Sequence, residues 1–428
     1  MAATAFFSLL CLAGYSSGLQ LRIEGRRNVR PGHEVMRRGL NMDGTAALSD
    51  DADINYHTNL TLGGQLFTVQ LDTGSSDLWV AGTVADSIDT GLISAISYAK
   101  GGAEGPIKLS TLEFAGHTVQ DQAFMQVTPD SDHPIGKGVL GLGPTSGSNI
   151  YYNLTTSDGY TVLDHIFLQD TSAPNYLTVL LGRTQDPPDV FPGEISIGEL
   201  LDGYSNVESE PKLAATINPV GESLDQHFQI LLDQDGIIGP DGKPISITTK
   251  VKQTPNSEQA TAVLDTGFAL TQVPKSVADE IYSRFSGAEY INVPGVGEVW
   301  VLPCDEEVNI TFKIGGNSYH IHPLDATMDL SLANLFDLKN SIGRSFCVGS
   351  FQPFSFTPSA PTYDVILGMS FLRNVYAVFN YGDFVANGND TTIRGDPYVQ
   401  LLSTTDPAEA HSDFVAVRMK DLAQGLRT

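Results

Sequence analysis

Residues 69–80 read Val-Gln-Leu-Asp-Thr-Gly-Ser-Ser-Asp-Leu-Trp-Val, and residues 262–268 read Ala-Val-Leu-Asp-Thr-Gly-Phe. In both stretches an apolar, strand-like run leads directly into an Asp-Thr-Gly turn, which carries Asp72 in the first copy and Asp265 in the second. At average amino-acid usage a chain of this length contains about a tenth of an Asp-Thr-Gly by chance. Two copies in matched surroundings therefore indicate an internal repeat, and we predict two related lobes that each supply one carboxylate.

A second pair of matching segments extends the repeat. Val139-Leu-Gly-Leu-Gly follows the first turn, and Val365-Ile-Leu-Gly follows the second. The 42 glycines and 23 prolines are spread along the chain, a distribution typical of many short strands joined by turns. We therefore predict an all-β protein built from two lobes.

The composition excludes several classes of protein. The 428 residues include 24 Lys and Arg against 50 Asp and Glu, which gives a formal net charge of −26. Such an acidic chain would be repelled by the phosphates of a nucleic acid. The length is ample for two or three domains with large cores.

The N-terminus has the pattern of a secretory signal peptide. Residues 5–14 form a short apolar run, and Ser16 and Gly18 offer a cleavage site for a signal spanning residues 1–18. The run is too short to span a membrane, which takes about 20 apolar residues, and the C-terminus has no apolar tail for a lipid anchor. We predict a secreted protein without a membrane segment, extracellular or vacuolar.

A basic segment follows the predicted signal peptide. Residues 19–38 contain six Arg and two Glu, whereas the rest of the chain is acidic. Such a segment could bind the acidic body at neutral pH and be released by acid, when carboxylates become protonated. The alternative is a disordered basic tail, and charge alone does not decide between the two.

Removal of the signal peptide takes Cys11 away and leaves Cys304 and Cys347, enough for one disulfide in an oxidising compartment. No Cys-x-x-Cys exists, and His320 and His322 have no evident third ligand, so we predict no metal and no cofactor. Four sequons are consistent with a glycosylated secreted chain; they lie at Asn59, Asn153, Asn309 and Asn389.

These motifs together resemble the pepsin-like aspartic protease family of secreted, fungal-type enzymes, and the resemblance covers residues 55–403. Residues 96–101 (Ile-Ser-Tyr-Ala-Lys-Gly) resemble the flap that closes over substrate. Residues 366–380 resemble the family's C-terminal signature, and Cys304 and Cys347 fit its second-lobe disulfide.

The resemblance implies a bilobal all-β fold of two pseudo-symmetric, barrel-like lobes with the active-site cleft between them. The first lobe would span residues 52–205 and the second 206–405, with residues 406–428 as a C-terminal tail. Residues 19–38, with an end as late as residue 52, would be the pro-segment of a zymogen and its intramolecular inhibitor. We expect a monomer.

The chemistry points to the same two carboxylates. Like charges about 3 Å apart cannot both ionise, so Asp72 and Asp265 would share one proton, activate a water and polarise the scissile carbonyl. Their pKa values belong to the pair, and neither is assigned as the acid or the base. The resemblance implies supporting roles for the residues that follow each Asp, namely Thr73, Gly74, Ser75, Thr266 and Gly267.

The predicted flap carries the substrate-binding residues. Tyr98 would cap the substrate and exclude water, beside Lys100 and Gly101. Trp79 would support the Tyr98 ring, although a plain core Trp is an equal reading. Lys100 could disfavour Lys or Arg next to the scissile bond, but a solvated lysine that points away is the favoured alternative.

Phe268 departs from the family pattern, which has Ser or Thr after the second Asp-Thr-Gly. The hydroxyl partner of Asp265 is therefore missing, and we expect burial to disfavour its ionised form. We predict an aspartic endopeptidase that cuts proteins or peptides at acid pH beside large apolar residues and is inhibited by pepstatin-type compounds. The alternative is a catalytically weak or silent relative that binds peptides or inhibits a partner enzyme through the same cleft.

Overall fold

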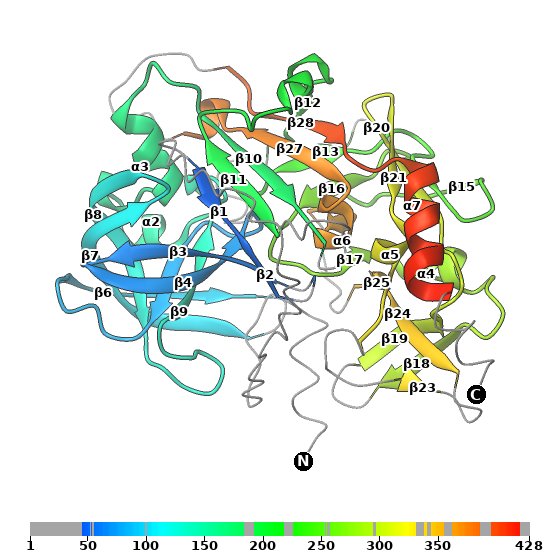
Figure 1. The fold of residues 1–428 in the computed structure, drawn as a ribbon. Coiled ribbons are helices and arrows are strands. Elements are labelled where there is room, and N and C mark those ends of the chain that lie inside the picture. Colours follow the sequence, from blue (N-terminus) through cyan, green and yellow to red (C-terminus); the bar gives the residue numbers. More distant parts are fainter. Residues whose placement is uncertain are drawn as a thin grey trace, which may run out of the picture.

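The computed structural model describes residues 45–419 except 52, 54, 99–100, 184–191, 218–225, 253, 255–256, 294–296, 331–337, 340–343, 355–361 and 386–394. The predicted signal peptide, the basic segment, Lys100, Asn389 and residues 420–428 therefore lie outside the described residues. Within the described part the chain is mostly β and bilobal, as the sequence predicts (Figure 1).

The first lobe is built on one eight-stranded sheet, at the left of Figure 1. Alternation of buried and exposed residues produces its strands: in β3 the side chains of Tyr56, Thr58, Leu60 and Leu62 are buried, while the intervening residues are more exposed. The strand order is β2 (Ser49–Asp51), β3 (Asn55–Leu62), β4 (Gln65–Asp72), β9 (Lys137–Gly141), β5 (Leu78–Ala81), β8 (His117–Val127), β7 (Gly102–Phe114) and β6 (Ile88–Ser97).

The second lobe contains three smaller sheets, at the right of Figure 1. The first has the order β13 (Gln229–Leu231), β16 (Thr261–Leu264), β26 (Val365–Leu367), β17 (Thr271–Val273) and β25 (Phe351–Pro353). The second is β15 (Pro244–Ile245), β14 (Ile237–Ile238), β20 (Ile310–Ile314) and β21 (Asn317–Ile321). The third is β18 (Glu289–Val293), β19 (Gly297–Pro303), β24 (Ser345–Gly349) and β22 (Thr327–Met328), with β23 (Leu338–Lys339) on β24.

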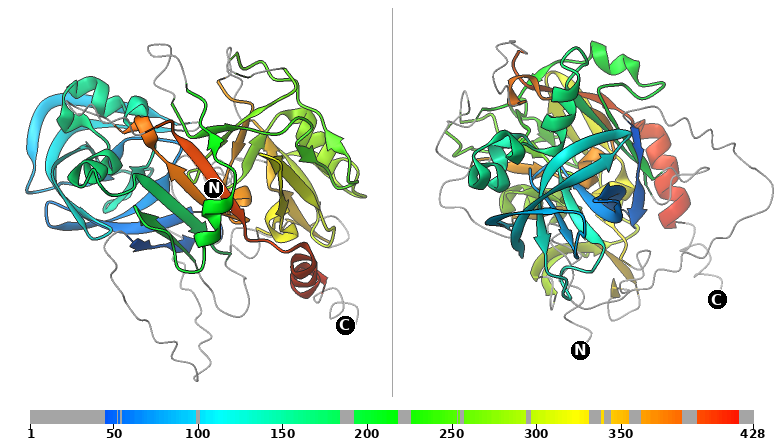
Figure 2. Two further views of the ribbon diagram at one scale, coloured as in Figure 1. Left: turned by 90° about the horizontal axis from the view of Figure 1, so that it is seen from above. Right: turned by 90° about the vertical axis from the view of Figure 1, so that its left-hand side faces the viewer.

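A six-stranded antiparallel sheet lies between the lobes and is made by both halves of the chain (Figure 2). Its order is β1 (Thr45–Ala47), β11 (Gly193–Ile197), β10 (Tyr176–Leu181), β27 (Val375–Asn380), β28 (Tyr398–Ser403) and β12 (Leu213–Ala214). Strand β1 pairs with β11 in this sheet, and β2 pairs with β3 in the first lobe.

The repeat seen in the sequence is also a repeat of sheet pairing. The strand before Asp72 runs parallel to β9, which carries the first apolar-apolar-Gly segment. The strand before Asp265 runs parallel to β26, which carries the second. Gly141 and Gly368 end these segments, and a Cβ on either would overlap the backbone of the facing turn. The same local packing is therefore used twice.

Short helices cover the sheets: α2 (Asn149–Leu154), α3 (Val162–Gln169), α4 (Lys275–Tyr282), α5 (Pro323–Ala326), α6 (Met369–Leu372) and α7 (Pro407–Phe414). Shorter 3₁₀ helices lie at Thr145–Gly147, Ser157–Gly159, Ser205–Ser209 and Gly382–Phe384, and a π-helical turn lies at Val415–Met419. In the part of the chain that is described, no helix is long and apolar enough to cross a membrane.

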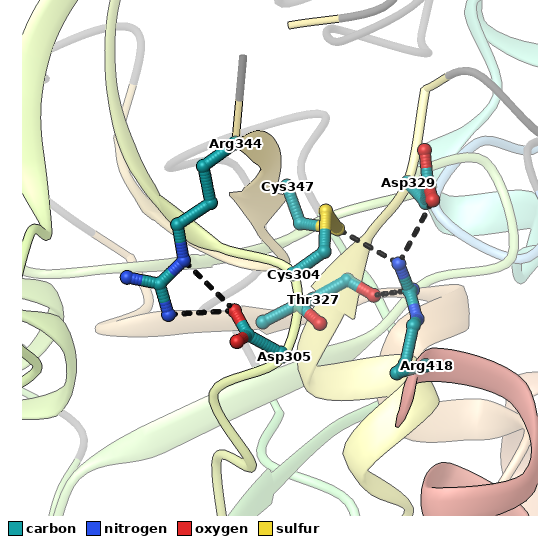
Figure 3. The surroundings of a disulfide bond; sticks show 7 residues. All are labelled: Cys304, Asp305, Thr327, Asp329, Arg344, Cys347 and Arg418. Carbon is teal, nitrogen blue, oxygen red and sulfur yellow. Dashed lines mark hydrogen bonds and ion pairs between the residues drawn. A yellow bond between two sulfur atoms is a disulfide. The ribbon is translucent and has the colours of Figure 1, made fainter. Parts of the chain in front are cut away.

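Residues 407–419 pack against the second lobe, and Figure 3 shows Arg418 of this segment beside the disulfide. Asp406 caps α7 by accepting bonds from two backbone N–H groups, and Phe414 is fully buried. Beyond the helix, Arg418 pairs with Asp329 at 3.2 Å and lies beside the disulfide that joins Cys304 to Cys347. The polar composition of this segment conceals a small apolar face that needs the second lobe to cover it.

Candidate active site

The turn at Asp72 presents a carboxylate that is held on both oxygens. Asp72 ends β4 and its residue is only 6% exposed. The backbone N–H of Gly74 donates to Oδ1 at 2.9 Å, and the Ser75 hydroxyl donates to Oδ2 at 2.6 Å. Hydrogen bonds of this kind favour the ionised carboxylate.

The turn at Asp265 repeats the backbone bond but not the hydroxyl bond. Asp265 follows β16 and is also 6% exposed. The Gly267 N–H donates to its Oδ1 at 2.6 Å. Phe268 occupies the position of Ser75, is 7% exposed, and has no hydroxyl to donate. The second carboxylate therefore sits beside an aromatic residue.

Two threonines fasten the turns together across the lobes. The Thr73 hydroxyl accepts from the backbone N–H of Thr266 at 3.0 Å and donates to the carbonyl of Leu264 at 2.8 Å. Thr266 does the reverse: its hydroxyl accepts from the N–H of Thr73 at 3.0 Å and donates to Leu71 O at 3.1 Å. All four bonds are buried, so each threonine fixes the position of the opposite turn.

The two glycines allow the carboxylates to approach each other. A Cβ on Gly267 would lie 2.5 Å from Asp72 Oδ1 and 3.0 Å from Asp265 Oδ1. A Cβ on Gly74 would overlap the Asp265 carboxylate. Any side chain at either position would therefore push apart the two acids, which explains why only glycine fits these turns.

Burial and mutual repulsion perturb both acids. Burial raises the pKa of Asp72, and the bonds from Ser75 and Gly74 oppose that rise. Burial, followed by the charge of Asp72, raises the pKa of Asp265 well above its ordinary value. The larger rise in pKa is thus at Asp265, the carboxyl that lacks a hydroxyl donor.

The segment predicted as a flap is a hairpin of β6 and β7. Tyr98 lies at its end, and its N–H donates to the carbonyl of Gly101, whose φ of +74° suits a glycine turn. The indole N–H of Trp79 donates to the Tyr98 hydroxyl at 2.6 Å. Trp79 is fully buried, so it is both a core residue and a partner of the flap.

Sequence reasoning missed a histidine that contacts this hairpin next to its tip. Both ring nitrogens of His133 make hydrogen bonds, one to the flap backbone at Gly102, and the ring lies 5.5 Å from that of Trp79. A single histidine in a polar loop carries no motif, and only the register of β7 reveals its partner.

A buried ionic cluster joining the halves of the chain was also missed. Asp325 in α5 pairs with Arg373 at 2.6 Å and with Arg183, which follows β10, at 2.7 Å. Burial raises the pKa of Asp325, but the two arginines outweigh it and hold the pKa below its ordinary value. The partners lie far apart in sequence, so no local pattern could pair them.

The remaining predicted positions are spread over the surface and the second lobe. The sequons at Asn59, Asn153 and Asn309 are exposed. His320 and His322, which would share a strand face as metal ligands, do not: His320 bonds Thr311 on β20, whereas His322 is buried and caps α5.

Comparison with known proteins gives a consistent result. A family model described as eukaryotic aspartyl protease matches residues 55–91 and 224–385. The chain is similar to major aspartyl peptidase 1 of Cryptococcus neoformans, with 29% identity over 366 residues that cover 79% of this chain and 69% of that protein. It is 24% identical over 373 residues to human cathepsin D, covering 78% and 80%.

Two fungal proteins extend this picture. Vacuolar protease A of Aspergillus fumigatus is 26% identical over 355 residues, which cover 77% of each chain. Among solved structures, the aspartic proteinase from Irpex lacteus matches with a TM-score of 0.61 and 19% identity, covering 85% of this chain and 97% of that one. The structural match supports the bilobal fold.

Proposed function

This chain belongs to the eukaryotic aspartyl protease family and is an aspartic-type endopeptidase, and from this premise we propose that Asp72 and Asp265 are its catalytic dyad. One observation carries the proposal: two buried carboxylates meet across the lobes, so close that a single added Cβ at Gly267 would touch both. Peptide hydrolysis needs a base for water and an acid for the carbonyl, and such a pair supplies both.

The unequal support of the two acids assigns their roles in the first step. Asp72, with Ser75 and Gly74 as donors, is the ionised base that takes a proton from water. Asp265, desolvated beside Phe268, holds the shared proton and gives it to the carbonyl oxygen as the water oxygen bonds to carbon. The proton gained by Asp72 then passes to the departing amine, Asp265 takes a proton back from one hydroxyl of the tetrahedral intermediate, and the peptide bond breaks to leave a carboxylic acid and an amine.

The flap would close over an extended substrate. Tyr98, held by Trp79, would cover the scissile bond and keep water out. Gly101, with its positive φ, allows the hairpin to turn at its tip. Large apolar residues on either side of the scissile bond are the preferred substrates in this proposal.

The enzyme would be made as a monomeric secreted or vacuolar zymogen. Residues 1–18 would direct export, residues 19–38 would inhibit the acidic body until acid weakens their attraction, and Cys304–Cys347 suits an oxidising compartment. The lobes would span residues 52–205 and 206–405, and the exposed sequons at Asn59, Asn153 and Asn309 would carry glycans. N-terminal sequencing of the secreted protein, with and without acid, tests this processing.

Hydrolysis of denatured haemoglobin, followed from about pH 2 to about pH 7, tests the dyad. Acid-treated protein should cut with an acid optimum, and pepstatin should block it because its statine hydroxyl replaces the dyad water. Loss of cutting in both Asp72→Asn and Asp265→Asn would support the dyad. Folded protein free of its pro-segment that never cuts would instead favour a silent, peptide-binding role, with Phe268 as the cause.

A further inference from the structure

His133 lies in the loop of residues 128–136, between β8 and β9, and reaches the flap hairpin next to its tip. Its Nε2 is 2.9 Å from the carbonyl oxygen of Gly102, the first residue of the returning flap strand. Its Nδ1 is 2.9 Å from Oδ1 of Asp130. The imidazole therefore joins the loop of residues 128–136 to the flap, which would move when substrate enters.

Both partners of this ring are acceptors. A backbone carbonyl and an ionised carboxylate cannot donate a hydrogen bond, so each ring nitrogen of His133 must carry a hydrogen. Only the doubly protonated, cationic imidazolium meets that demand, because a neutral ring has one N–H and one lone pair. We propose that His133 is an acid-dependent positioning residue, which in its cationic form clamps the flap strand at Gly102 and thereby sets Tyr98 over the substrate.

The groups around the ring agree with a positive charge. Desolvation raises the pKa of Asp130, but the bonds that it accepts from the backbone N–H groups of His133 and Asp132 and from the His133 ring together outweigh it and hold the pKa below the ordinary value. Asp130 therefore stays ionised in moderate acid. Asp132 adds a second carboxylate from the same loop, and the Trp79 ring, which bonds Tyr98, offers an aromatic system that attracts a cation.

The consequence is a link between pH and the flap. At acid pH the imidazolium satisfies both partners, and the strand at Gly102 is held. When the ring loses a proton as pH rises, one nitrogen can no longer donate, and one of the two bonds must break. The inference rests on the proposed role of the flap, and it gives the enzyme an acid requirement beyond that of the dyad.

The decisive measurement is the ratio of kcat/KM between the wild type and His133→Gln as a function of pH. Taking the ratio cancels the titration of the dyad, which both proteins share. Gln can donate to Gly102 but cannot become charged, so we expect a ratio of about ten at acid pH that falls toward one as pH rises. His320→Gln, the same change on a second-lobe strand, should give a ratio near one throughout. A ratio that is independent of pH would overturn the proposal.

A second readout does not depend on activity. The chain has only two tryptophans, Trp79 and Trp300, and a protonated imidazole quenches the fluorescence of an indole that it contacts. Subtracting the emission titration of His133→Gln from that of the wild type should leave a rise as pH increases. No such difference would refute the cationic clamp, even in a protein that proves inactive.

If His133→Gln fails to fold, Asp130→Asn replaces it. Loss of the carboxylate makes the imidazolium harder to form, so the emission transition should move to lower pH than in the wild type. An unmoved transition would contradict the bridge from His133 to Asp130. A protein that shows the emission transition but no hydrolysis would count against the proposed function and leave the clamp supported.

Discussion

The turn at Asp72 and the turn at Asp265 make the same backbone contacts but receive different support from the residue after the glycine. Ser75 donates to the first carboxylate, whereas Phe268 is buried and has no hydroxyl to donate to the second. The threonine bonds, by contrast, are the same on both sides. The two carboxylates are therefore held in equivalent positions but differ in their affinity for a proton. The equivalent positions let the pair share one proton, and the difference in affinity decides which carboxyl holds it.

Replacing either acid should have the largest effect on catalysis. Asp72→Asn and Asp265→Asn should each lower kcat by at least about 10³-fold, since one removes the base and the other the acid. Hydrolysis of a peptide substrate by the purified, pro-segment-free variants measures this. Substantial activity in either variant would mean that the pair does not work as one unit.

Adding a methyl group between the acids tests how much their closeness matters. Gly267→Ala would place its Cβ 2.5 Å from Asp72 Oδ1, and displacing that oxygen should cost about 10²-fold in kcat. Gly242→Ala is the control: a Cβ there would meet nothing within 4 Å, although the positive φ of Gly242 (+75°) makes an alanine strained. The control should lose some stability and keep its activity; equal losses of activity in both variants would contradict this account.

Replacing Thr73 or Thr266 tests whether the two threonines contribute equally to the hydrogen bonds that join the turns. Thr73→Val and Thr266→Val each leave a buried N–H and a buried carbonyl without their partner, at a cost of about 2–3 kcal/mol in the free energy of unfolding. Because the bonds are reciprocal, the two variants should lose the same amount. Denaturant unfolding at acid pH measures the free energy of unfolding of each variant. A much larger loss of stability in one variant would show that the two threonines do not contribute equally.

The raised pKa of the acids predicts a stability that depends on pH. A carboxyl whose pKa is higher in the folded state stabilises the fold while it is protonated and costs stability as pH rises toward that higher pKa. Asp265→Asn mimics the protonated form, so it should exceed the wild type by about 1–2 kcal/mol at neutral pH and match it in strong acid. Asp72→Asn should gain less, because Ser75 already supports its charge. Equal gains in the free energy of unfolding for the two variants would contradict the proposed difference in proton affinity between Asp72 and Asp265.

The smallest expected effect comes from making the turns alike. Phe268→Thr supplies Asp265 with a donor, which stabilises its ionised form and lowers its pKa. The dyad then loses its shared proton more easily, so the alkaline limb of the pH–rate profile should move down by about one pH unit. An unchanged profile would show that Phe268 has no influence on the dyad.

The parts of the site that the sequence predicts are those encoded locally. An Asp-Thr-Gly after an apolar strand fixes a turn, and its repetition predicts both the two lobes and the meeting of Asp72 with Asp265. His133 was not foreseen, because its meaning depends on which backbone carbonyl of β7 it faces. Asp325 and Arg183 are 142 residues apart, and α7 looks polar until its few apolar residues find the second lobe. Contacts set by register and docking have no signature within a short window.

The sheet between the lobes has a consequence for assembly. Strand β10 comes from the first half of the chain and pairs over its length with β27 from the second half. Neither half of the chain can form the six-stranded sheet alone. A polypeptide that ended between β10 and β27 would therefore expose a strand edge with unpaired backbone groups. The repeat suggests two independent units, but each half of the chain needs strands of the other half to complete the shared sheet. The site between the lobes therefore forms only when both halves are present.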